Sequence, residues 1–228
     1  MTRIDDATHI DNTGKAAIFD LDGTLLDSMG VWDQVDIDLL SQRGIDVPDD
    51  YSTKVASMQF RQIAEYTIAR FHLPDTPEAL MDEWDEMARV MYATVVEAKP
   101  GAVDYLRRLK ATGARLAVAT SLPPALRGAA MAHVGIDGFF DEVVSVDDVG
   151  DVGKDHPDVY LLAASRLGVE PSDCTVFEDL LVAIRSARSV GMRVWAMQDD
   201  SSAGDWPAIC EEADGILFDG FDCAPMAL

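Results

Sequence analysis

The chain has 228 residues, 48% of them hydrophobic, enough to bury a large core in one domain with an insertion or in two modest domains. Its 41 acidic residues outnumber 18 basic ones, and the formal net charge of -23 argues against nucleic acid or an anionic membrane as main partner. No apolar stretch approaches the ~20 residues that span a bilayer, and the first residues lack the apolar core of a signal peptide.

The three cysteines are odd in number and have no metal-ligand spacing, which suits a reducing compartment better than a disulfide framework. We therefore expect a cytoplasmic protein without nucleic-acid or membrane partners. The sequence leaves the oligomeric state open and is compatible with a monomer. Residues 1–15 and the segment after Asp219 are expected to be loose ends.

The first predicted element is a short buried strand at residues 16–20, which ends in a carboxylate. Similar apolar runs that finish in a polar residue occur at 116–120 and 174–179. Helical segments bounded by proline and glycine lie between them, at 100–113 and 157–168. This β-then-α alternation predicts an α/β fold with a doubly wound parallel sheet, whose ligands bind beyond the carboxyl ends of the strands.

Between about residues 29 and 98 the spacing of apolar residues is helical throughout, without strand-like alternation. We expect a helical cap here, residues 29–98, inserted into a core made of residues 1–28 and 99–228. The insertion follows directly after the first strand, so it would hang over that strand's carboxylates as a lid hinged at Gly30 and at residues 99–101. The alternative is that these hinges are two plain surface turns.

Polar side chains gather at the predicted strand ends: Asp20, Asp22, Thr120, Ser121, Lys154, Glu178 and Asp179. Two aspartates one residue apart repel each other and are poor strand formers, so local stability does not explain Asp20 and Asp22. The Asp20 carboxylate can attack a phosphorus atom to give an aspartyl phosphate. An anion that approaches a phosphate dianion needs its charge neutralised.

A divalent cation meets that need. Asp20 and Asp179, helped by Glu178, supply the hard oxygen ligands that Mg²⁺ prefers. Taken alone, the pair Glu178 and Asp179 is better explained as the acidic start of a helix.

The remaining strand-end residues complete a phosphoryl-transfer site. Lys154 can balance the nucleophile and a phosphate oxygen, while the Thr120 hydroxyl and the Ser121 amide can hydrogen-bond another oxygen. Asp22 is left to protonate the departing alcohol and then to take a proton from the water that opens the aspartyl phosphate. Each residue alone has a plainer interpretation, such as a surface lysine, a strand-end cap, or a turn in which Ser28 or its neighbour caps the next helix.

The segments DLDGTLLDS, AVATS, GKDHPD and VFED, in that order, resemble the four motifs of the haloacid dehalogenase superfamily of phosphotransferases. The resemblance spans roughly residues 16–198, and the insertion is similar to the helical cap of the β-phosphoglucomutase-like subfamily. It implies a Rossmann-like core, a mobile cap, Mg²⁺ and small phosphorylated metabolites as substrates. By this similarity Asp20 is the nucleophile and Asp22 the acid and base, with the Asp22 backbone carbonyl also on the metal.

Departures from the family pattern refine the prediction. Dehalogenases of the superfamily lack an acid at the position of Asp22, so phosphate chemistry is favoured. Trp32 stands where the resembling sugar phosphomutases carry a histidine, which favours a phosphatase of sugar or sugar-alcohol phosphates; a mutase is the alternative. Leu180 and Ala183 replace the usual small polar residue and glycine of the fourth motif, and could alter metal affinity or loop shape.

Substrate choice is expected in the cap, where residues 57–62 resemble the position of the subfamily's specificity loop. Arg61 is the predicted contact, to a second phosphate or to sugar hydroxyls, and Lys54 is a weaker candidate; a solvated arginine is the alternative. A receiver-like phospho-acceptor module is a remote alternative for the whole chain. It is disfavoured because the second acid, Asp22, and the helical insertion both follow Asp20.

Overall fold

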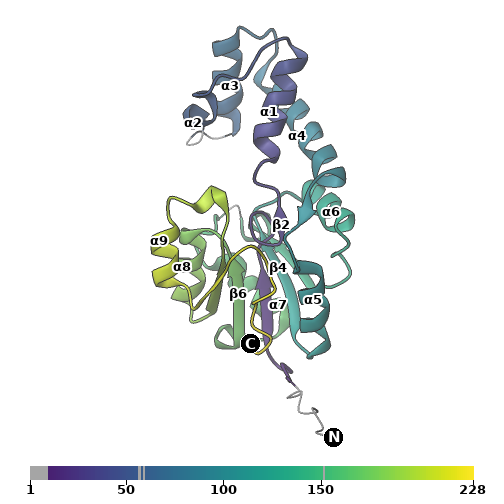
Figure 1. Cartoon of the computed structure of the whole chain (residues 1–228), viewed down its shortest axis with the longest axis vertical. Helices are drawn as coiled ribbons and strands as arrows, with labels where there is room; N and C mark the ends of the chain where they lie inside the picture. The colour runs from purple at the N-terminus through teal and green to yellow at the C-terminus, as the bar shows by residue number, and fades with distance from the viewer. Residues whose placement is uncertain (1–9, 56–57, 59, 151) are drawn as a thin grey trace, which may run out of the picture.

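The computed structural model describes residues 10–55, 58, 60–150 and 152–228, and a helical lobe stands above a sheet-containing lobe (Figure 1). The helices are α1 (Val31–Gln42), α2 (Tyr51–Val55), α3 (Phe60–Phe71), α4 (Pro77–Thr94), α5 (Ala102–Ala111), α6 (Pro124–His133), α7 (Asp158–Leu167), α8 (Leu181–Ser189) and α9 (Trp206–Glu212). The strands are β1 (Ala16–Phe19), β2 (Leu26–Asp27), β3 (Glu97–Ala98), β4 (Arg115–Thr120), β5 (Glu142–Ser145), β6 (Cys174–Glu178), β7 (Arg193–Met197) and β8 (Gly215–Leu217).

Six parallel strands form the main sheet in the order β5-β4-β1-β6-β7-β8. β1 lies between β4 and β6, so that Phe19 pairs with Val118 on one side and with Phe177 on the other. The strand order reverses about β1, and such a switch point is where doubly wound sheets bind their ligands. The predicted α/β fold, a Rossmann-like doubly wound core with inserted helices, is confirmed.

Both faces of the sheet are covered by helices, and β1 shows why the strand has an unbroken apolar sequence. Ala17 and Phe19 belong to the hydrophobic cluster that includes α5 and α6, whereas Ala16 and Ile18 belong to the cluster that includes α7, α8 and α9. Side chains alternate between the two faces of a strand, so a strand covered on both sides is apolar at every position.

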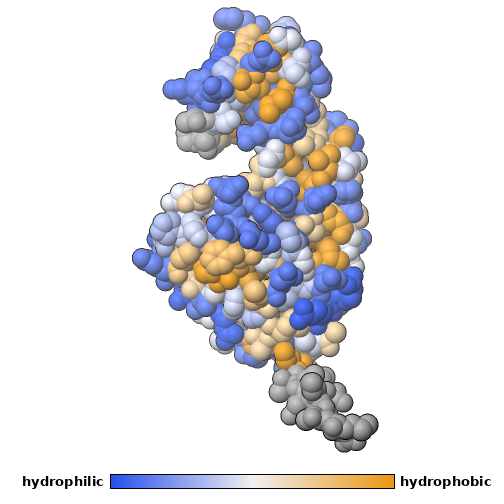
Figure 2. Space-filling model, in the orientation of Figure 1, coloured by the Kyte–Doolittle hydropathy of each residue, from blue (hydrophilic) through white to orange (hydrophobic). Residues whose placement is uncertain are grey.

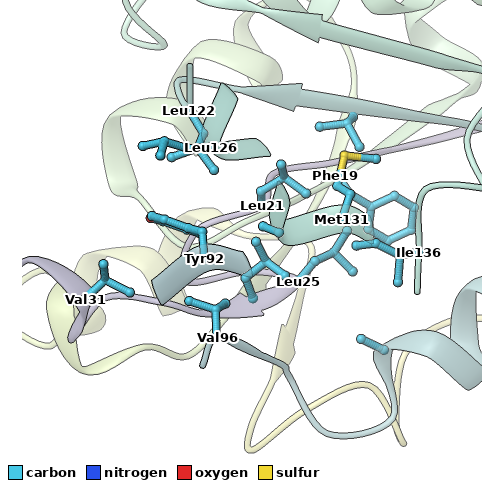
Figure 3. Packing of buried hydrophobic residues seen from close by; sticks show 14 of the residues in the cluster. Phe19, Leu21, Leu25, Val31, Tyr92, Val96, Leu122, Leu126, Met131 and Ile136 are labelled. Carbon is cyan, nitrogen blue, oxygen red and sulfur yellow. The ribbon is translucent and has the colours of Figure 1, made fainter. Parts of the chain in front are cut away.

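Helices α1–α4 form the upper lobe, which an antiparallel pair of short strands, β2 and β3, joins to the sheet-containing lobe. The predicted helical pattern for residues 29–98 therefore missed β3, whose two residues are too few to show alternation. Helix α4 continues downward and packs against α6. Figure 3 shows Tyr92 of α4 near Leu122 and Leu126, and all three belong to one buried cluster that extends from the sheet into the upper lobe.

The end of the chain is packed, which corrects the expectation of a loose segment after Asp219. Phe221 is buried and its ring stacks on Tyr105, with centroids 5.3 Å apart. The Asn12 side chain donates to the Met226 carbonyl at 2.7 Å and accepts from the Leu228 amide at 3.0 Å. Asn12 is itself buried, so the predicted N-terminal tail is ordered at this point, while residues 1–9 lie outside the described residues.

The cysteines are all free thiols: Cys174 is buried, and Cys210 and Cys223 are exposed. This agrees with the prediction that the chain has no disulfide framework. Across the part of the chain that the structure describes, every helix is too short or too polar to cross a membrane.

Candidate active site

Asp20 is the first residue after β1, and the sheet fixes its position. Its backbone N–H donates to the Phe177 carbonyl of β6 at 3.0 Å, and only 5% of the residue is exposed. The ammonium of Lys154 contacts an oxygen of Asp20 and lies 2.5 Å from Glu178 Oε1. Burial alone would lower the pKa of Lys154, but the carboxylates of Asp20 and Glu178 raise it above its usual value. Lys154 is therefore a permanent cation between two acids.

Glu178 ends β6 and organises the loop that follows. Oε1 accepts from the Tyr160 hydroxyl at 2.8 Å, and Oε2 accepts from the backbone N–H groups of Asp179 and Leu180 at 3.0 and 3.2 Å. Glu178 is fully buried, and these donors, together with Lys154, give both of its oxygens hydrogen-bond partners. Glu178 thus positions both Lys154 and the neighbouring Asp179.

Asp179 presents the unpaired group of the site. Its Oδ1 accepts from the Thr24 hydroxyl at 3.2 Å, but Oδ2 is buried without a hydrogen-bond partner among the described residues. Gly23 has a φ of 79°, and a Cβ there would come within 2.6 Å of that same oxygen. Glycine is therefore needed at this turn both for its backbone conformation and for the close approach of Asp179.

Three carboxylates, those of Asp20, Glu178 and Asp179, each place an oxygen within 4.8 Å of the others. Burial raises the pKa of Asp20 and of Asp179, and the charge of Glu178 raises both further. A divalent cation would relieve this repulsion and give the orphaned Asp179 oxygen a partner. The residues present therefore fit Mg²⁺, which prefers such hard oxygen ligands.

Asp22 lies where the two lobes meet. Its Oδ1 accepts hydrogen bonds from Ser28, just after β2, and from the Tyr92 hydroxyl of α4, at 2.9 Å. Burial raises the pKa of Asp22, and these two donors partly offset that effect. Helix α1 begins after Gly30 without a side-chain cap, so Ser28 serves Asp22 rather than capping the helix.

Thr120 ends β4 beside β1 and is buried. Its hydroxyl oxygen accepts from the Leu122 amide at 3.0 Å, which leaves the hydroxyl hydrogen free to be donated toward a ligand. Ser121 is exposed at the same edge. In the fourth motif, the Leu180 side chain is 41% exposed and Ala183 is buried within α8, so neither side chain adds a group to the acidic cluster.

Arg61 is the predicted contact that the structure does not bring to this cluster. It lies on α3, 56% exposed, and forms ion pairs with Glu65 at 3.2 Å and Glu78 at 2.7 Å. Lys54 on α2 is also exposed. Residues 57 and 59 of the predicted specificity loop lie outside the described residues.

Sequence reasoning missed four side chains that hold the acids in place: Thr24, Ser28, Tyr92 and Tyr160. Thr24 and Ser28 belong to the quoted DLDGTLLDS motif, so their polarity beside two aspartates was an available signal. The two tyrosines sit at apolar positions of α4 and α7, where a tyrosine is indistinguishable from a core residue.

The profile of the haloacid dehalogenase-like hydrolases matches residues 15–191, more than half of the chain. The chain belongs to the haloacid dehalogenase-like hydrolase family. The predicted family is thus confirmed, and the enzyme is a hydrolase of this type. The match contains every strand-end residue named above, from Asp20 to Asp179.

Two named phosphatases and one solved structure are similar to this chain over most of its length. Fructose-1-phosphate phosphatase YqaB of Escherichia coli is 35% identical, covering 77% of this chain and 92% of its own. A phosphorylated carbohydrates phosphatase of Thermotoga maritima is 26% identical, covering 78% and 82%. A solved structure from Thermotoga maritima, provisionally described as a β-phosphoglucomutase, has a TM-score of 0.81 at 24% identity, covering 91% of this chain and 95% of that one. At that identity the likeness shows the fold. The prediction of a phosphomonoester hydrolase agrees with both phosphatase names.

Proposed function

We propose that the protein is a Mg²⁺-dependent phosphatase of sugar or sugar-alcohol phosphates that works through an aspartyl phosphate on Asp20. The observation that carries the proposal is the meeting of Asp20, Lys154 and the unpaired Asp179 oxygen at the carboxyl end of the sheet. Identity of 35% to a fructose-1-phosphate phosphatase supports the substrate class.

The first half-reaction transfers the phosphoryl group to the enzyme. A carboxylate oxygen of Asp20 attacks phosphorus, the bond from phosphorus to the sugar oxygen breaks, and protonated Asp22 gives its proton to that oxygen. Lys154 holds a phosphate oxygen by charge, and the Thr120 hydroxyl donates to another. Mg²⁺ held by Asp20, Asp179, Glu178 and the Asp22 carbonyl would neutralise the charge of the phosphoryl group.

The second half-reaction regenerates the enzyme. Ionised Asp22 takes a proton from a water molecule, whose oxygen attacks phosphorus, and the bond from phosphorus to the Asp20 oxygen breaks. Inorganic phosphate leaves, and Asp22 is again protonated for the next cycle. One residue therefore serves as acid and as base, which requires that it stay near Asp20 without binding the phosphate itself.

The test is a panel of sugar and sugar-alcohol phosphates incubated with Mg²⁺, with inorganic phosphate and isomerised sugar phosphate measured in the same samples. We expect phosphate release that depends on Mg²⁺ and is lost in Asp20→Asn, with Asp82→Asn, an exposed acid on α4, as the matched control. Conversion between 1- and 6-phosphates would instead identify a mutase. Undiminished phosphate release by Asp20→Asn would overturn the proposal.

A further inference from the structure

A cavity of about 610 Å³ opens between the helical lobe and the sheet-containing lobe. Figure 2 shows the molecule hollowed between the two lobes. Met29, Asp33 and Ser201 line both this cavity and a second one, of about 750 Å³, which extends to Asp199 after β7. Met29 follows Ser28, whose hydroxyl donates to the Asp22 carboxylate, so both cavities adjoin the proposed acid and base.

The wall of the smaller cavity that the helical lobe provides is aromatic. Trp32 and Phe60 meet edge to face with ring centroids 5.6 Å apart, and Phe60 and Trp84 are also 5.6 Å apart. All three rings line the cavity. Broad aromatic walls with few polar groups are typical of small-molecule sites, and such walls suit the C–H face of a sugar.

Two polar groups on this wall face each other, the indole N–H of Trp84 and the carboxylate of Asp36. Trp84 is 2% exposed, and its indole N–H is buried without a normal hydrogen bond among the described residues. Asp36, which also lines the cavity, is half-buried; its carboxylate accepts a long, 3.5 Å bond from Tyr51 and interacts with the Trp84 N–H. A carboxylate held by two such weak donors keeps acceptor capacity that a ligand hydroxyl can use.

The charge of the cavity has one sign. Asp33 and Asp36 are its charged members among the described lining residues, and the sequence has no basic residue between Val55 and Phe60. The lysine of the larger cavity, Lys99, is bonded to Asp199 at 2.7 Å. A second phosphate or a carboxylate on the ligand would meet like charges here, which is costly in a partly enclosed site.

We infer that this cavity binds the sugar portion of the substrate, and that it accepts a polyhydroxylated leaving group without negative charge and rejects one that carries a second phosphate or a carboxylate. The inference rests on the proposed phosphatase function and names its substrate class. It differs from the expectation that Arg61 binds a second phosphate, because Arg61 is paired with Glu65 and Glu78 and is not among the described lining residues.

The experiment compares kcat/KM within two matched sets of substrates. The first is fructose 1-phosphate against fructose 1,6-bisphosphate; the second is glucose 6-phosphate and glucosamine 6-phosphate against 6-phosphogluconate. We expect the member without the extra anion to be favoured at least about 100-fold in each set in which turnover occurs. Equal turnover, or preference for the anionic member, would overturn the inference.

Substitutions in the cavity test whether its acids cause the difference in kcat/KM between the two kinds of substrate. Asp36→Asn should reduce the ratio about tenfold, and so should Asp33→Asn, an exposed position whose substitution leaves the core untouched. Asp82→Asn removes the same charge from the upper lobe but lines neither cavity, so it should leave the ratio unchanged. A ratio unaffected by both Asp33→Asn and Asp36→Asn would contradict the assignment.

The two proposals fail in different ways. If phosphate release depends on Asp20 but the anionic substrates are turned over equally well, the phosphatase function stands and the cavity inference falls. If no member of either set, nor p-nitrophenyl phosphate, releases phosphate in an Asp20-dependent manner, the phosphatase function falls and the cavity inference falls with it.

Discussion

The acids at the edge of the sheet and the acids of the cap cavity are organised in opposite ways. Asp20 and Glu178 leave neighbouring parallel strands and share one buried lysine, Lys154. Asp33 and Asp36 lie one turn apart on α1, and the described lining of their cavity contributes no cation. We propose that the first group holds a cation and a phosphoryl group, whereas the second excludes anions. On these proposals, the same residue type would serve catalysis in one region and substrate selection in the other.

Removal of Mg²⁺ should have the largest effect on activity. It should act on the acids at the edge of the sheet and not on those of the cap cavity. We expect chelation to abolish phosphate release and Mg²⁺ to restore it. At 100 times its Kd, Mg²⁺ should stabilise the fold by about 2.7 kcal/mol. Thermal unfolding of the wild type and of Asp179→Asn, with and without Mg²⁺, measures this. If Mg²⁺ stabilised Asp179→Asn as much as the wild type, the metal would not be bound at the edge of the sheet.

Lys154→Met should come next, because it leaves Asp20 and Glu178 buried without their cation. Breaking a buried pair by removing one partner costs about 3–5 kcal/mol, so denaturant unfolding should show a loss of that order together with loss of activity. The exposed Lys54→Met is the control and should change stability by less than about 0.5 kcal/mol. Comparable losses in both variants would mean that Lys154 has no special place in the site.

Tyr92→Phe tests the link between the two regions, because its hydroxyl extends from α4 to Asp22. Loss of a hydrogen bond to a charged group costs about 1.5 kcal/mol, so kcat should fall about tenfold with little change in KM. Tyr105→Phe, whose hydroxyl bonds Pro225, is the buried control. In an Asp22→Asn background Tyr92→Phe should cost almost nothing; a tenfold loss there as well would show that Tyr92 acts elsewhere.

Asp36→Asn should have the smallest of these effects, a change in stability that depends on pH. Burial, with the charge of Asp33, raises the pKa of Asp36 from 3.8 to about 6. Because the folded state holds this proton more tightly than the unfolded chain, stability is lost as pH rises through that window, and the loss is complete above about pH 6. The variant should unfold about 2–4 °C higher than wild type at about pH 7.5, corresponding to about 1 kcal/mol. At about pH 4 the two should coincide; a constant difference at both pH values would contradict this origin.

The edge of the sheet was largely predictable because parallel strands deliver their final residues to one place. Asp20, Thr120 and Glu178 each end or follow a strand, so their order in the chain was enough to group them. Fold class followed from the same alternation. The lengths of β2 and β3, two residues each, gave no pattern to detect.

The contacts that the sequence did not predict depend on packing between elements that are far apart in the chain. Tyr92 reaches Asp22 only because α4 runs down against α6, and Phe221 is buried only because it meets Tyr105. Arg61 shows the converse: its basic charge suggested a substrate contact, but two glutamates lie within ion-pair distance in the folded cap. Helical periodicity states which face is apolar, and it does not state which partner that face meets.

The most direct test of the account is to trap the intermediate. The Mg²⁺-loaded protein is mixed with fructose 1-phosphate, quenched in acid within one turnover, and its peptides are analysed by mass spectrometry. We predict one phosphoryl group, on Asp20, that is absent from Asp20→Asn and disappears as free phosphate forms. Turnover with the phosphoryl group on another residue, or with Asp20 never modified, would contradict the central claim.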